Sequence, residues 1–173
     1  ITHCTIAGDP RFDQAKTTAA LPFEDAIIKQ FIHKPVLVAG STWKDDLTLL
    51  KAWFDLNHTS HQLIIAPHNI NDATIADIIA TFADYSVQRY TQYNANQTPA
   101  ILILDTFGVL SKLYREATVV WIGGGWNKTG IHNSVEAAVY AKPLFWGPRY
   151  NRYREATDLI ATNGAKSVET GAA

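Results

Sequence analysis

Short apolar runs alternate along the chain with longer segments in which apolar residues recur every three or four positions. The short runs, rich in β-branched residues, predict β-strands, and the longer pattern predicts helices. The expected strands cover residues 2–7, 35–39, 62–66, 86–90, 100–104, 118–122 and 143–146. These strands are apolar nearly throughout, so we expect helices on both faces of one sheet. The pattern predicts a parallel, doubly wound, Rossmann-like α/β domain.

Two of the predicted helices have a clear apolar face. The first carries Leu47, Leu50, Trp53, Phe54 and Leu56, and the second carries Ile75, Ile78, Ile79 and Phe82. We expect both stripes to pack into the core. The polar segment 91–98 predicts a surface loop, and nothing in the chain suggests an internal repeat or domain boundary. In such a sheet, ligands bind at the carboxyl ends of the strands, which is where candidate chemistry should lie.

Composition narrows the class of protein. Hydrophobic residues make up 47% of the chain and charged residues 18%, as in ordinary globular proteins. The formal net charge is -1, so there is no general attraction for nucleic acid or anionic lipid, and any anion site must be local. Cys4 is the single cysteine, which favours a reducing compartment such as the cytoplasm. No apolar run approaches the ~20 residues that span a bilayer, so we expect a soluble chain.

The chain begins at Ile1 and contains no methionine. We therefore expect either a fragment of a longer protein or a sequence from which methionines are missing.

The segments after the first two predicted strands carry candidate anion-binding groups. Arg11 follows the first strand, and its guanidinium could clamp a phosphate or a carboxylate by paired hydrogen bonds. The alternative is a surface ion pair with Asp9 or Asp13, worth ~0 to 1 kcal/mol. After the second strand, Ser41 or Thr42 is expected to cap a helix that starts near residue 44. The free amides of that helix could bind an anion, although for an isolated Gly-Ser-Thr segment capping alone is the better explanation.

Two further sites could suggest chemistry. His58 and His61 have the spacing of a metal pair, but their loop offers no cysteine or acidic cluster, so we expect them to be solvated. Asp105, in an Asp-x-Phe-Gly sequence after a strand, resembles the nucleophile loop of haloacid dehalogenases. That family places its motif on the first strand, so nucleophilic catalysis by Asp105 ranks low.

The strongest signal is the stretch of residues 123–136, in which a glycine loop follows a strand and leads into a helix expected to begin near His132. Its glycines allow positive φ and close approach of a ligand, and the helix would present free amides to phosphate. The spacing is not Gly-x-Gly-x-x-Gly, so a dinucleotide cofactor lacks its main support. Glu136 could accept hydrogen bonds from both ribose hydroxyls, at about 1.5 to 3 kcal/mol each. Alternatively, Glu136 only offsets the helix dipole, at about 0.3 to 1 kcal/mol.

The ordered segments GDPRFD, AGSTW, IIAPHNI, LDTFGVLSKLY, VVWIGGGWNKTGIHNSVEAA and PLFWGPRYNRYREA together resemble the carboxyl-terminal domain of bacterial 3-deoxy-D-manno-octulosonic acid (Kdo) transferases. These enzymes are glycosyltransferases of the two-domain GT-B architecture, and the resemblance covers nearly the whole chain. It implies transfer of Kdo from CMP-Kdo to the lipid A precursor in lipopolysaccharide biosynthesis. The expected location is the cytoplasmic face of the inner membrane of Gram-negative bacteria.

The resemblance also implies roles for individual residues. Arg11 would stabilise the transition state, and the general base would lie in an amino-terminal domain that this chain lacks. That domain would also bind the acceptor and contact the membrane. Val109 departs from the family, since many members carry Glu there. The expected CMP contacts are Pro67, His68, Phe107, Gly108, Val109, Asn133, Ser134, Val135 and Glu136, and the candidate phosphate contacts are Ser41, Thr42, Gly124 and Gly125.

No cofactor and no metal is expected, since the chain contains no Asp-x-Asp pair to hold a metal-bound nucleotide. Two other interpretations stay open. The chain could be a nucleotide-binding module that is inactive alone, or part of another GT-B enzyme such as a UDP-sugar transferase or epimerase.

Overall fold

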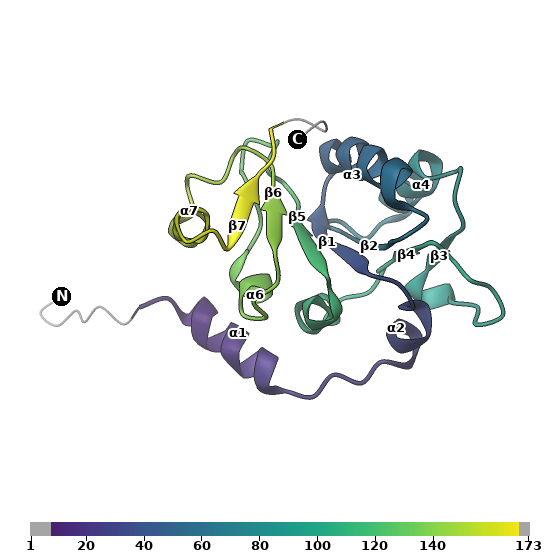
Figure 1. Cartoon of the computed structure of the whole chain (residues 1–173), viewed down its shortest axis with the longest axis horizontal. Helices are drawn as coiled ribbons and strands as arrows, with labels where there is room; N and C mark the ends of the chain where they lie inside the picture. Colours follow the sequence, from purple (N-terminus) through teal and green to yellow (C-terminus); the bar gives the residue numbers. More distant parts are fainter. Residues whose placement is uncertain (1–7, 170–173) are drawn as a thin grey trace, which may run out of the picture.

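The computed structural model describes residues 8–169, so the predicted strand at 2–7 and Cys4 lie outside the described residues. The rest forms a seven-stranded parallel sheet in the order β3-β4-β2-β1-β5-β6-β7. Figure 1 shows this sheet with helices on both faces. The predicted Rossmann-like α/β fold is therefore confirmed. The strands are β1 (Val36–Thr42), β2 (Gln62–Pro67), β3 (Val87–Arg89), β4 (Ile101–Ile103), β5 (Val119–Ile122), β6 (Leu144–Trp146) and β7 (Ala165–Ser167).

Across residues 8–169, seven α-helices and two 3₁₀ turns accompany the strands, with the first two helices preceding β1 and the others lying between strands. They are α1 (Pro10–Ala20), α2 (Ala26–Phe31), α3 (Lys44–Asn57), α4 (Asp72–Thr81), η1 (Tyr90–Gln92), α5 (Leu110–Leu113), η2 (Tyr114–Glu116), α6 (Val135–Ala138) and α7 (Arg154–Ala161).

Successive strand residues point to opposite faces of the sheet and form two cores. Val36 and Val38 of β1 pack on the face covered by α2, α5, α6 and α7, whereas Leu37 and Ala39 pack under α3 and α4. Both faces are apolar because both are buried, which is why the strands read as continuous hydrophobic runs.

The apolar stripes of α3 and α4 are partly as predicted. Leu47, Leu50 and Phe54 are buried, but Leu56 is 83% exposed. Leu56 follows Phe54 by two residues, which is more than half a helical turn, so it lies on the opposite side of α3. Ile79 is 44% exposed because it follows the fully buried Ile78 by one residue, which is more than a quarter of a helical turn, so its side chain points partly away from the core.

The start of α3 differs from the prediction that Ser41 or Thr42 caps it. Both residues belong to β1, where the register shifts between Gly40 and Thr42 and Ser41 adopts a φ of 52°. Trp43 is the N-cap instead, and its amide donates to the Asp46 carboxylate at 2.7 Å. The capping prediction is wrong because β1 runs to Thr42. The helix nevertheless starts at Lys44, as expected.

The chain reverses direction across the sheet between β1 and β5. From β1 it passes to β2 and on to the edge strand β3, comes back to β4 between β2 and β3, and then returns to β5 beside β1. A crevice at the carboxyl ends of two such strands is the usual ligand position in doubly wound folds. The segments that follow β1 and β5 are therefore the first place to look for a site.

Candidate functional site

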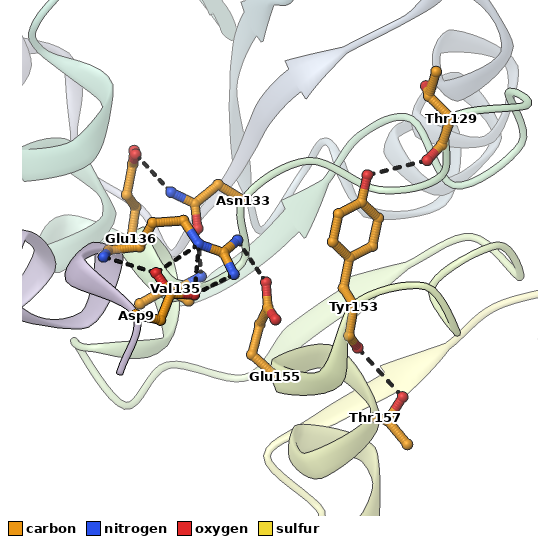
Figure 2. Close-up of polar contacts among 9 residues, drawn as sticks. Asp9, Thr129, Asn133, Val135, Glu136, Tyr153, Glu155 and Thr157 are labelled. Atoms are coloured by element: carbon orange, nitrogen blue, oxygen red, sulfur yellow. Dashed lines mark hydrogen bonds and ion pairs between the residues drawn. The ribbon is translucent and has the colours of Figure 1, made fainter. Parts of the chain in front are cut away.

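A groove of about 410 Å³ lies between α1, α5 and the start of α6. It joins Arg11, near one end of the chain, with Asn133 and Glu136, more than a hundred residues later. Figure 2 shows Asn133 and Glu136 beside the ion pair that links α1 to α7. We call this space the Arg11 groove, and its lining is Pro10, Arg11, Gln14, Ala15, Thr18, Ser111, Asn133 and Glu136.

Two carboxylates hold the Arg11 guanidinium. Its Nη2 lies 2.6 Å from Asp9 Oδ2, and its Nη1 lies 2.8 Å from Glu155 Oε1. Hydrogen bonds with Asp9 and Glu155 raise the pKa of Arg11 above its usual range. The Asp9 pair is the one that the sequence suggested, but Glu155, 144 residues away, was missed. The three side chains together carry one positive and two negative charges.

The segment before α6 is organised by Asn133. Its Oδ1 accepts from the Val135 amide at 3.1 Å, and its Nδ2 donates to Glu136 Oε1 at 2.9 Å. Helix α6 begins at Val135, so the expected start near His132 is wrong: the His132 amide donates to the Gly123 carbonyl instead. With only four residues, α6 offers little dipole to an anion. Ser134 is buried, and its Oγ finds no hydrogen-bond partner among residues 8–169.

The glycine loop packs closely against the protein itself. A Cβ on Gly123 would lie 2.3 Å from the Ser41 carbonyl oxygen, and one on Gly125 would lie 2.5 Å from the Gly147 Cα. The Gly124 amide donates to Asp46 Oδ2 at 3.0 Å, so that amide is already occupied.

Asp46 ties the start of α3 to this loop. It is buried, and it accepts hydrogen bonds from the Trp43 amide, the Gly124 amide and Trp121 Nε1. Burial raises the pKa of Asp46, and these hydrogen bonds oppose the rise.

Three aromatic rings stand together beyond β1 and β2. The Trp43 and His68 rings stack at 4.4 Å between centroids, and the His132 ring lies 4.3 Å from His68. Burial, followed by the charge of His68, lowers the pKa of His132. Thr42, Trp43 and His68 also line a smaller cavity of about 140 Å³. His132 was not singled out by the sequence, although it directly precedes Asn133.

The loop after β4 has two parts. Asp105 is buried and accepts from the Arg89 Nε and from the amide and hydroxyl of Thr91. Burial alone would raise the pKa of Asp105, but the hydrogen bonds from Thr91 and Arg89 lower it. The loop then turns outward, leaving Phe107 80% exposed and Gly108 at a φ of 80°.

The remaining predicted contacts lie at the same edge of the sheet. Pro67 ends β2, and Val109 precedes α5, whose Ser111 lines the Arg11 groove. Ser41 is half-buried, and the Thr42 hydroxyl donates to the Ala66 carbonyl at 3.4 Å. The predicted roles of these residues stay predictions.

Within residues 8–169, no three His, Cys, Asp or Glu side chains gather as a metal site would require. His58 packs against Phe54, and His61 meets Trp53 edge-on. None of the helices described is long and apolar enough to cross a membrane.

No family model matches the chain. A 3-deoxy-D-manno-octulosonic acid transferase from Aquifex aeolicus is 27% identical over 132 residues, covering 75% of this chain and 36% of the relative. One from Haemophilus influenzae is 24% identical over 144 residues, covering 80% of this chain and 34% of the relative. The chain thus spans about a third of the length of these relatives.

Among solved structures, the C-terminal CMP-Kdo binding domain of WaaA from Acinetobacter baumannii is similar. The TM-score is 0.67 at 19% identity, over 93% of this chain and 83% of that one. By sequence and fold together, the chain is a homologue of the 3-deoxy-D-manno-octulosonic acid transferases and has the fold of such a carboxyl-terminal domain.

Proposed function

We propose that the chain is the donor-binding half of a Kdo transferase and binds the CMP part of CMP-Kdo at the Arg11 groove. The observation that carries this proposal is the meeting of Arg11, Asn133 and Glu136 in one groove. A cation for phosphate and a carboxylate for ribose hydroxyls are the two polar groups that a nucleoside monophosphate needs.

Each of these side chains has a distinct task in the proposal. Glu136 uses one carboxylate oxygen for Asn133, which fixes its orientation, and offers the other to the ribose. Arg11 faces the phosphate. As CMP leaves the anomeric carbon, positive charge builds on the sugar and negative charge on the phosphate, which a preorganised guanidinium stabilises.

In the complete protein, the acceptor would be the lipid A precursor, at the cytoplasmic face of the inner membrane. The general base that activates this acceptor would come from the amino-terminal domain. We therefore expect the isolated chain to bind CMP and to transfer nothing. Detectable Kdo transfer by the purified chain would contradict this division of labour.

Calorimetric titration of the chain with CMP, UMP and UDP tests the donor assignment. We expect CMP to bind most tightly. Glu136→Gln should weaken CMP binding by about tenfold or more, because a hydrogen bond to a charged group contributes about 1.5 to 3 kcal/mol. The matched control is Glu116→Gln on η2, an exposed residue outside the Arg11 groove. A clear preference for UDP would favour another GT-B nucleotide-sugar enzyme.

The role of Arg11 requires the complete enzyme. If Arg11 acts mainly on the transition state, Arg11→Ala lowers kcat more than it weakens CMP binding. Equal losses in kcat and in CMP affinity would refute the transition-state role and leave Arg11 as a ground-state contact.

A further inference from the structure

A second cavity, of about 470 Å³, is lined by positively charged side chains. Lys128 comes from the glycine loop, and Arg149 and Arg152 come from the segment between β6 and α7. All three are exposed. We call this cavity the basic pocket, and its lining is Lys128, Gly130, Pro148, Arg149, Asn151 and Arg152.

No carboxylate neutralises these three cations within the described residues. The ion pairs found across residues 8–169 include none to Lys128, Arg149 or Arg152. Arg11, in contrast, is shared between two carboxylates. The whole chain carries a net charge of only -1, so this local excess of positive charge is a specific feature of the surface.

The backbone beneath the basic pocket is fixed. The Arg149 amide donates to the Gly125 carbonyl at 2.9 Å, and the Ile131 amide donates to the Arg149 carbonyl at 3.1 Å. The Tyr153 hydroxyl donates to the Thr129 carbonyl at 3.1 Å, as Figure 2 shows. These bonds join the two segments that supply the cations. Ligand binding would therefore cost little backbone conformational entropy.

We propose that the basic pocket binds a phosphate monoester group of a ligand other than the donor nucleotide. Each of the two guanidinium groups can donate two hydrogen bonds to phosphate oxygens, and the lysine adds a point charge. Three uncompensated positive charges suit a dianionic phosphate better than a single carboxylate. The basic pocket and the Arg11 groove have no lining residue in common, which separates the ligand from CMP.

The phosphate could belong to a small soluble molecule or to a lipid headgroup, and two measurements distinguish these sources. Calorimetry with inorganic phosphate and glycerol 3-phosphate tests the soluble source. Cosedimentation with phosphatidylcholine vesicles, with and without phosphatidic acid, tests the lipid source. Vesicles containing phosphatidylglycerol, a phosphate diester, control for attraction to any anionic surface.

The test variant is Lys128→Gln/Arg149→Gln/Arg152→Gln. The control variant, Lys16→Gln/Lys29→Gln/Arg154→Gln, removes the same charge from exposed residues that do not line the basic pocket. We expect the test variant to bind phosphate at least about tenfold more weakly than the wild type, and the control variant to bind normally. The single variants Arg149→Gln and Arg152→Gln give the same comparison if the triple variant does not fold.

Three results would overturn the proposal: no binding of any phosphate probe by the wild type, equal losses in the two triple variants, or a loss of phosphate binding in Arg11→Gln as large as in the test variant, which would place the phosphate in the Arg11 groove. Failure of the wild type to bind CMP in the separate titration would count against the proposed function alone.

Discussion

At the residue scale, the Asp105 carboxylate joins the end of β4 to the end of β3 through Arg89 and Thr91. We predict that Asp105→Asn lowers the free energy of unfolding by about 2 to 4 kcal/mol, because it removes a buried ion pair. Hydrogen bonding lowers the pKa of Asp105 below 3.8, so its stabilising contribution is present above that pH and is lost as pH falls through the folded pKa.

Urea unfolding of Asp105→Asn, at neutral and at acid pH, measures both effects. Asp13→Asn is the matched control, since Asp13 is exposed on α1. An unchanged free energy of unfolding, together with loss of a measurable phosphatase activity, would instead support Asp105 as a nucleophile.

His132 makes a second residue-scale prediction. Its folded pKa is lowered from 6.5 by burial and by His68, so between these two pKa values the unfolded chain binds a proton that the folded chain does not. The free energy of unfolding should therefore fall as pH drops below 6.5. His132→Gln should flatten this part of the stability curve, measured by urea unfolding between about pH 5 and 8. His61→Gln serves as the control, and parallel curves for the wild type and His132→Gln would contradict the prediction.

At the scale of elements, Asp46 joins the start of α3 to the glycine loop by hydrogen bonds. Asp46→Ala leaves the Trp43 amide, the Gly124 amide and Trp121 Nε1 without their acceptor. We expect a loss of about 2 to 5 kcal/mol in the free energy of unfolding, since each unsatisfied buried donor costs about 1 to 3 kcal/mol. The neighbouring Asp45→Ala, at an exposed position, should change stability by no more than about 0.5 kcal/mol. Equal effects of the two substitutions would show that these hydrogen bonds contribute little.

The pattern of apolar residues predicts a helix or strand correctly where residues close together in the chain determine it. Strands β1, β2, β4, β5 and β6 were predicted because each has an apolar run. Strand β3 was also predicted, although its sequence, Val-Gln-Arg, has no such run. Strand β7 was missed because its sequence, Ala-Lys-Ser, has no apolar run and the strand is defined by pairing with β6. The start of α6 was misplaced because the Asn133 Oδ1 accepts from the Val135 amide and the His132 amide donates back to the Gly123 carbonyl. Arg11 was noticed as a cation, but its partner Glu155 is a tertiary contact that no spacing rule reveals.

At the scale of the whole molecule, polar contacts at both ends attach α1 to the rest of the fold. Only Ala15 of this helix is buried, so apolar burial contributes little. Near its start, Arg11 reaches Glu155 on α7. At its end, Arg115 Nη2 donates to the carbonyls of Ala19, in the last turn, and of the C-cap Leu21. Because α1 supplies one wall of the Arg11 groove, its attachment determines whether that groove is formed.

We therefore predict that Glu155→Gln speeds amide hydrogen exchange in the first turns of α1, and that Arg115→Gln does so in its last turn. Arg11 is 41% exposed, so the ion pair is worth no more than about 1 kcal/mol, which corresponds to about a fivefold faster exchange. Exchange in α3, on the opposite face of the sheet, should not change. If the Arg11 groove holds the nucleotide, saturating CMP restores protection in α1 of both variants. Equal acceleration in α1 and α3 would mean that Glu155 stabilises the whole fold rather than the position of one helix.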